Sequence, residues 1–272
     1  MKFPIALQLY TVRDDMAKDF EGTLRKVKAM GYDGVEFAGL FGKSAAEIKA
    51  LCAEIGLNPI SAHVPYLDMV ADEKLLEVYA EIGCKFVVIP YLTEEYRPNV
   101  NPDGFRRVIA DAKRLGQRAK ELGMTLAYHN HDFEFAKLDG KYALDLLFES
   151  VPQDLLQAEL DTCWVNVGGE PPAEYMKKYA GRLDILHLKD FVGQKAENMY
   201  ALIGLKNTEN NQAEPQKFEF RPVGEGVQDF PAILASAEEC GTEWIVVEQD
   251  RPCLGYTPME CAERSVRYLR SL

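Results

Sequence analysis

Histidine, tryptophan and basic residues are scarce in this chain. Its 272 residues include four histidines and two tryptophans, and the formal net charge is −12. Because phosphate binding needs a basic surface, the charge argues against a nucleic-acid partner. The six cysteines form no Cys-x-x-Cys pair, so we expect buried thiols rather than disulfides or a zinc knuckle.

Long apolar runs are missing as well. No segment approaches the ~20 consecutive apolar residues that a transmembrane helix needs. The first residues, MKFPIALQLYTVRDD, lead from a short apolar stretch directly into Arg13 and Asp14, unlike a signal peptide. We therefore expect a non-secreted, cytoplasmic protein with no membrane partner.

Short apolar segments alternate with longer amphipathic ones along the whole chain. Several of the short segments are almost continuously apolar, which is typical of parallel strands covered on both faces. The expected strands span residues 5–12, 34–39, 59–65, 86–91, 125–131, 155–165, 184–190 and 244–250. The expected helices span residues 19–31, 44–56, 72–83, 105–122, 141–150, 172–181, 229–241 and 257–270.

Eight strand–helix units in a chain of this length predict an α/β fold, the (β/α)8 TIM barrel. A doubly wound open sheet is the alternative. No linker or change in composition divides the chain, so we expect a single domain over residues 1–272. Residues 191–223 form an extended, amide-rich loop after the seventh strand. Such a loop is either a functional lid or a surface decoration, and it is a candidate interface if the protein is a homo-oligomer.

Unusual polar residues gather at the C-terminal ends of the expected strands, where a TIM barrel has its active site. All the histidines lie there: His63, His129, His131 and His187. Asp161 and Glu248 interrupt apolar runs, and a buried carboxylate must be paired or bind a metal. Imidazoles and carboxylates without cysteine suit a divalent ion such as Mn²⁺, Co²⁺, Zn²⁺ or Mg²⁺.

Other residues at these strand ends have two interpretations. Arg13 and Lys189 either bind substrate oxygens or neutralise an acidic mouth. Trp164, just beyond Asp161, is expected in the core and, as a second interpretation, in the wall of a sugar site.

Seven segments in order resemble a known family: QLYTVRD, GVEF, AYHNHDFEF, ELDTCWV, HLKD, RPVGEGVQDF and VVEQD. They are similar to segments of the xylose isomerase-like TIM barrels, which include sugar phosphate isomerases/epimerases, inosose dehydratase and ketose 3-epimerases. The resemblance covers nearly the whole chain. It implies a metal site at Asp161, His187 and Glu248. The fourth ligand is His129, where the ketose epimerases have a glutamate, or alternatively Glu134.

The resemblance implies a divalent-metal-dependent sugar isomerase/epimerase, or a keto-sugar or inosose lyase (dehydratase), that abstracts a proton alpha to a carbonyl. Glu248, His131 or Glu134 would move the proton. The small carbohydrate or cyclitol substrate would be bound by His63, Glu36, Lys189, Arg13 and Trp164. Histidine at position 129 disfavours epimerisation by two matched glutamates, because its reference pKa is ~6.5 rather than ~4.3.

Two other classes of protein remain as alternatives. An endonuclease IV-like zinc phosphoesterase needs more histidine ligands and a basic groove, so four histidines and a net charge of −12 argue against it. A non-catalytic sugar-binding barrel would bind sugar without metal.

Overall fold

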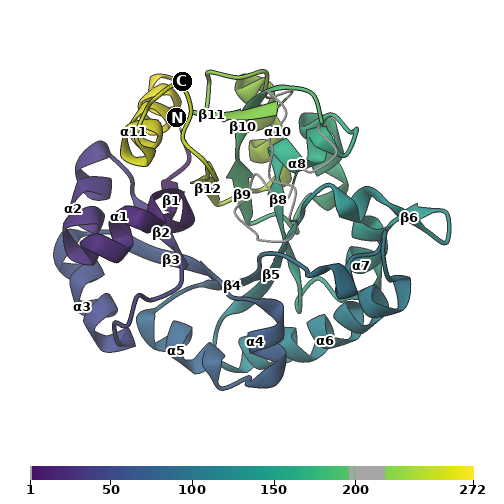
Figure 1. The fold of residues 1–272 in the computed structure, drawn as a ribbon. Coiled ribbons are helices and arrows are strands. Elements are labelled where there is room, and N and C mark those ends of the chain that lie inside the picture. Colours follow the sequence, from purple (N-terminus) through teal and green to yellow (C-terminus); the bar gives the residue numbers. More distant parts are fainter. Residues whose placement is uncertain (1, 196–198, 200–217) are drawn as a thin grey trace, which may run out of the picture.

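Eight parallel strands close into a barrel with helices outside it (Figure 1). The computed structural model describes residues 2–195, 199 and 218–272. The strands are β1 (Ile5–Gln8), β2 (Gly34–Ala38), β3 (Asn58–His63), β4 (Phe86–Ile89), β5 (Thr125–His129), β8 (Gln157–Asp161), β9 (Ile185–Leu188) and β12 (Trp244–Val247). They neighbour one another in this order, and β12 pairs with β1. The predicted TIM barrel is confirmed, and the open sheet is excluded.

The helices of the ring include all eight that the sequence predicts. Their bounds are α1 (Arg13–Lys18), α2 (Phe20–Met30), α3 (Ala45–Ile55), α4 (Tyr66–Ala71), α5 (Leu75–Ile82), α6 (Pro102–Glu121), α7 (Ala143–Ser150), α8 (Thr162–Val167), α9 (Pro172–Tyr175), α10 (Phe230–Cys240) and α11 (Pro258–Ser271). The helix expected over 172–181 is shorter, because α9 passes into a 3-10 turn, η4 (Met176–Tyr179). The sequence missed α1, α4 and α8, which are six residues each and too short to show helical periodicity.

Local signals explain where helices begin and end. In α3 the hydroxyl of Ser44 accepts the N–H of Glu47, and the Glu47 carboxylate accepts the N–H of Ser44. The same helix ends at Gly56, whose φ of 75° belongs to the left-handed region that glycine adopts easily.

The interior of the barrel has an apolar floor and a polar upper part. Side chains alternate along each strand, so Leu7 packs in the main core beneath the helices while Ala6 joins a separate cluster. That cluster holds Ala6, Ile60, Phe86, Ile185 and Val246 from five strands. The residues that follow at the strand ends are polar. The fold therefore concentrates polar side chains at one end of the barrel, above the apolar cluster.

Two antiparallel pairs of short strands lie outside the barrel, and the sequence did not predict them. Strands β6 (Lys137–Leu138) and β7 (Lys141–Tyr142) form one, and β10 (Asp190–Gly193) and β11 (Phe218–Arg221) form the other. The second pair forms the two ends of the loop predicted over 191–223. Much of that loop lies outside the described residues, so its role as a lid or interface stays a prediction.

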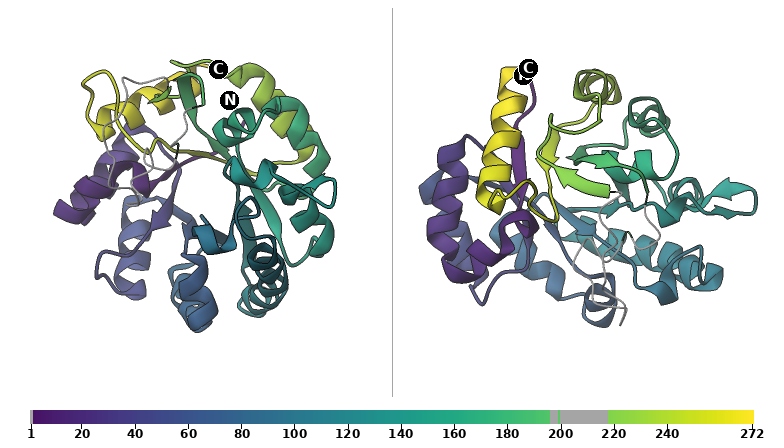
Figure 2. Two further views of the ribbon diagram at one scale, coloured as in Figure 1. Left: turned by 45° about the vertical axis from the view of Figure 1, so that its right-hand side comes forward. Right: turned by 45° about the horizontal axis from the view of Figure 1, so that its top comes forward.

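The two chain ends lie close together (Figure 2). Within the described part of the chain, no helix combines the length and the apolar character needed to cross a bilayer.

Candidate metal centre

Four strand ends bring together the four residues predicted to bind metal. His129 ends β5, Asp161 ends β8, His187 lies in β9, and Glu248 follows β12. The parallel register places Asp161 beside His187. One ligand atom from each of the four lies within 4.8 Å of the others, and all four side chains are buried. We call this set the mouth group.

The ligand atoms of the mouth group face one another without hydrogen bonds. His129 Nε2 lies 3.4 Å from Asp161 Oδ2 and 3.8 Å from Glu248 Oε2. His187 Nδ1 lies 3.3 Å from Glu248 Oε2. Among the described residues, none of these four atoms has a hydrogen-bond partner. Buried polar atoms left in this way are costly, and a bound cation would satisfy all four at once. The donor set of two imidazoles and two carboxylates therefore fits a divalent metal.

Lys189 is a buried cation beside the mouth group. Its Nζ lies 3.2 Å from Asp161 Oδ2, 2.8 Å from Glu248 Oε2 and 2.9 Å from Asp250 Oδ2. These contacts are buried ion pairs. The structure thus supports the neutralising role of Lys189, while its role in substrate binding stays a prediction.

The charges of the pocket favour a cation. Burial by itself raises the pKa of a carboxyl, yet Lys189 and nearby imidazoles hold the pKa of Asp161 below, and of Glu248 well below, the usual value. Burial by itself lowers the pKa of an ammonium, yet the carboxylates of Asp161, Asp250 and Glu248 raise the pKa of Lys189 well above its usual value. The carboxylates therefore stay ionised, and the pocket stabilises positive charge.

A second cluster, which we call the deep group, shares His187 with the mouth group. Its members are Glu36, His63, Glu159 and His187. His63 Nε2 lies 2.7 Å from Glu159 Oε2 and 3.0 Å from Glu36 Oε1. His187 Nε2 lies 2.8 Å from Glu36 Oε1. Burial and the Glu36 carboxylate raise the pKa of Glu159 well above its usual value.

Glu36, which is predicted to bind a substrate hydroxyl, lies in the deep group, and its contact with substrate stays a prediction. Glu36 is fully buried, and its carboxylate accepts hydrogen bonds from Gln8 Nε2 and Ser61 Oγ, both at 2.6 Å. With His187 Nε2 as a third partner, Glu36 is held within the deep group. His63 is also engaged in this group, although 9% of its side chain is exposed, and its contact with substrate stays a prediction.

Glu134 does not reach either group, so the structure gives no support for it as the fourth ligand or as a base. Its carboxylate accepts the hydroxyl of Tyr128 at 2.5 Å and the N–H of His131 at 2.9 Å. The side chain is fully buried, and burial raises its pKa to about 8. The fourth member of the mouth group is His129.

His131 lies next to the mouth group in an aromatic surrounding. Its ring centre is 5.2 Å from that of His129, 5.1 Å from Trp164 and 5.0 Å from Tyr91. Burial, together with His129 and Lys189, holds the pKa of His131 well below its usual value, so the ring is neutral. Trp164 is fully buried, as the interpretation of Trp164 as a core residue predicts.

Arg13 links the loops after two neighbouring strands. Its Nη1 donates to the carbonyl oxygens of Tyr10 at 2.7 Å and Asp250 at 3.1 Å. Three residues that hold the site are not among the predicted site residues. Gln8 and Ser61 fix Glu36, and Asn130 Oδ1 accepts the N–H of Asp161 at 2.9 Å. Asn130 carries a signal, because it separates two histidines in the segment HNH, and so does Gln8, a polar residue at the end of the first strand, whereas Ser61 carries none.

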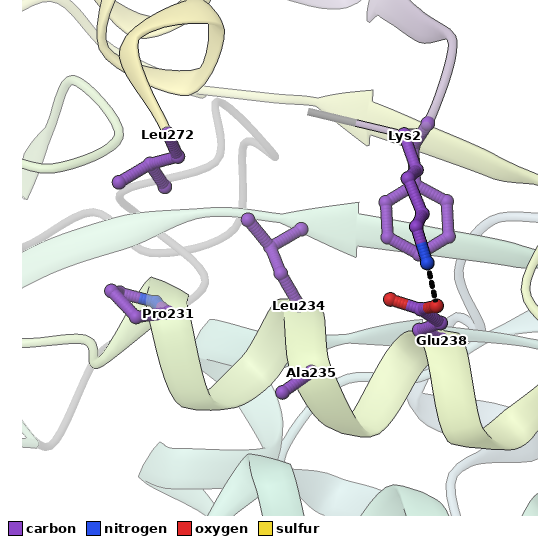
Figure 3. A pocket seen from close by; sticks show the side chains of 7 residues that line it. Lys2, Pro231, Leu234, Ala235, Glu238 and Leu272 are labelled. Carbon is purple, nitrogen blue, oxygen red and sulfur yellow. Dashed lines mark hydrogen bonds and ion pairs between the residues drawn. The ribbon is translucent and has the colours of Figure 1, made fainter.

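A hollow of about 320 Å³ lies elsewhere, near the chain ends (Figure 3). Lys2 and Phe3 line it before the start of β1, with Leu234 and Leu272. An ion pair between Lys2 and Glu238 is its main polar feature. None of the predicted site residues lies there, so the candidate site is the mouth of the barrel.

Known proteins share this sequence pattern and fold. A family model described as xylose isomerase-like TIM barrel matches residues 24–272. Inosose dehydratase of Lacticaseibacillus casei is 28% identical over 179 residues, which make up 64% of this chain and 56% of that protein. The chain thus matches little more than half the length of this curated relative.

Solved structures of low sequence identity have the same fold. A sugar phosphate isomerase/epimerase from Parabacteroides distasonis superposes with a TM-score of 0.75 at 23% identity, covering 98% of this chain and 93% of that one. The IOLI protein, solved with a bound zinc atom, superposes with a TM-score of 0.72 at 16% identity, covering 99% and 97% of the two chains.

Proposed function

The chain belongs to the xylose isomerase-like TIM barrel family, and on this premise we propose that it is a divalent-metal-dependent enzyme of keto-sugars or keto-cyclitols. The reaction is abstraction of a proton alpha to the substrate carbonyl. One observation carries the proposal: four buried ligand atoms on four strand ends face one another without hydrogen bonds among the described residues. The zinc atom of the IOLI structure supports a divalent ion in a barrel of this fold.

His129, Asp161, His187 and Glu248 would hold the ion. A divalent ion bound there supplies Lewis-acid polarisation of the substrate carbonyl. Glu248 is the proposed base, because Lys189 and His187 keep its carboxylate ionised despite burial. Lys189 contacts Glu248 and is placed to bind substrate oxygens. His131 lies beside His129 as the second candidate for proton transfer.

Loss of water is the reaction that this set of residues suits best. Epimerisation by two matched bases needs a carboxylate on each side of the substrate, and His129 stands where the second would be. Removal of water needs one base for the C–H proton and an acid for the leaving hydroxyl. Glu248 can take the first proton. Its protonation removes one of the carboxylates that raise the pKa of Lys189, and the Lys189 ammonium can then supply the second proton. The inosose dehydratase relative supports this choice, and sugar isomerisation or epimerisation is the alternative.

The test is proton exchange with heavy water across a panel of keto-sugars and inosose, combined with elemental analysis. We expect the wild type to carry a divalent metal and to exchange the proton beside the carbonyl, and Glu248→Gln to lose exchange. Asp145→Asn is the matched control, because this carboxylate bonds Tyr175 and Tyr179 outside the site. Exchange at the wild-type rate in Glu248→Gln would exclude Glu248 as the base. Sugar binding without metal or exchange would instead support a non-catalytic barrel.

A further inference from the structure

The two nitrogens of the His187 ring face the two different groups. Nε2 lies 2.8 Å from Glu36 Oε1 in the deep group. Nδ1 lies 3.3 Å from Glu248 Oε2 in the mouth group. A neutral imidazole has one N–H and one lone pair, so it can serve as a metal ligand toward only one of the groups.

The hydrogen bonds of the deep group decide which one. Glu36 accepts from Gln8 and Ser61 in addition to the His187 contact, and Glu159 pairs with His63. One carboxylate oxygen of that group, Glu159 Oε1, has no hydrogen bond to another described residue. In the mouth group, by contrast, all four facing ligand atoms lack such a partner within the described chain. Among the described residues, the deep group thus has one ligand atom without a hydrogen bond, whereas the mouth group has four, two of which are ion-paired with Lys189.

The strands hold Glu36 firmly in front of His187. The barrel register places Gln8 of β1 and Ser61 of β3 on either side of Glu36 in β2. Both donate to its carboxylate at 2.6 Å, and all three side chains are fully buried. The carboxylate cannot turn away without breaking buried hydrogen bonds, which makes its position fixed.

We infer that Glu36 is a positioning residue whose carboxylate accepts the proton of His187 Nε2 and so directs the lone pair of Nδ1 into the mouth group. The inference rests on the proposed function, since it takes the mouth group as the metal site. It follows that the deep group is not a second metal site and that the part of the chain that the structure describes binds one ion. Carboxylates that fix a metal-binding histidine in this way usually raise metal affinity about 10–100-fold.

Long-range ¹H–¹⁵N NMR of the histidine rings tests the proton directly in the wild type. With four histidines in the chain, the spectrum is simple. We expect His187 to carry a proton on Nε2 both in the metal-free and in the zinc-loaded protein. A His187 ring with Nε2 deprotonated in either state would overturn the inference. This measurement needs no variant, so it stands even if a substitution prevents folding.

Zinc titration against a competing chelator tests the consequence for binding. We expect one ion per chain in the wild type and about 10–100-fold weaker binding in Glu36→Gln. Glu159→Gln is the matched control, because Glu159 Oε2 lies 3.5 Å from His187 Nε2, beyond the 2.8 Å of Glu36. Its affinity should change less than threefold.

Two results of the titration would overturn the inference. One is unchanged zinc affinity in Glu36→Gln. The other is two ions per wild-type chain, with one lost in Glu159→Gln, which would make the deep group a metal site. If the wild type binds no metal at all, the proposed function fails, while the NMR result on the metal-free protein still decides whether Glu36 holds the Nε2 proton.

Discussion

At the scale of single residues, Glu134 illustrates how burial changes the chemistry of a carboxyl group. Its side chain is fully buried, and its partners are the hydroxyl of Tyr128 and the N–H of His131. The family resemblance places it among the candidate bases and metal ligands. The 3-10 turn η3 (Phe133–Phe135) instead directs it to Tyr128.

The raised pKa of Glu134 predicts a pH-dependent stability. The folded pKa is about 8 against an ordinary value of 4.5, so the folded state keeps a proton that the unfolded state loses between these values. The contribution is full below about pH 4.5 and is lost as the pH rises to about 8. We expect the free energy of unfolding of the wild type to fall relative to Glu134→Gln, by at most about 1.4 kcal/mol per pH unit. Urea unfolding of both proteins between about pH 5 and 8 measures the difference, and a constant difference would contradict the prediction.

At the scale of elements, Asp190 organises the turn that follows β11. Its carboxylate accepts four backbone N–H groups, from Phe191 at 2.9 Å, Gly224 at 3.1 Å, Gly226 at 2.8 Å and Gln228 at 3.2 Å. This explains the glycines of the segment RPVGEGVQDF. A side chain at Gly226 would meet Asp190 Oδ1 at 2.2 Å and the carbonyl oxygen of Phe191 at 2.3 Å.

Gly226→Ala should therefore be strongly destabilising. Because backbone as well as side chain must shift, we expect a loss of about 3 kcal/mol in the free energy of unfolding. Gly241→Ala is the control, since its φ of +83° strains the backbone but nothing lies within 4 Å of the added carbon. It should cost about 1–2 kcal/mol. Equal losses in the two variants, measured by urea unfolding, would show that the crowding at Asp190 relaxes freely.

At the scale of the whole molecule, the barrel mouth gathers buried negative charge. Five acidic side chains are buried there: Glu36, Glu159, Asp161, Glu248 and Asp250. Lys189 forms ion pairs with the last three. A metal that binds only the folded chain should therefore stabilise it. At about 100 times the dissociation constant, the gain is about 2.7 kcal/mol.

For a chain of this size, that gain corresponds to a rise of roughly 5–10 °C in Tm. Thermal unfolding with added Mn²⁺ or Zn²⁺, and again with chelator, measures it. Asp161→Asn should lose the rise, because it removes a ligand of the mouth group, whereas Asp145→Asn should keep it. A rise that persists in Asp161→Asn would place the stabilising ion elsewhere.

The sequence by itself determined the barrel and the convergence of the mouth group. Apolar runs and helix caps are local signals, and a closed parallel barrel puts every strand end at one mouth, so His129, Asp161, His187 and Glu248 had to meet there. Only the tertiary structure decided what each polar side chain does. Glu36 and Glu248 both lie within expected strands, but the register gives Glu36 to Gln8, Ser61 and His187, and leaves Glu248 Oε2 facing His129 and Lys189. Hydrogen-bond partners from distant strands depend on register and distance, which no local pattern encodes.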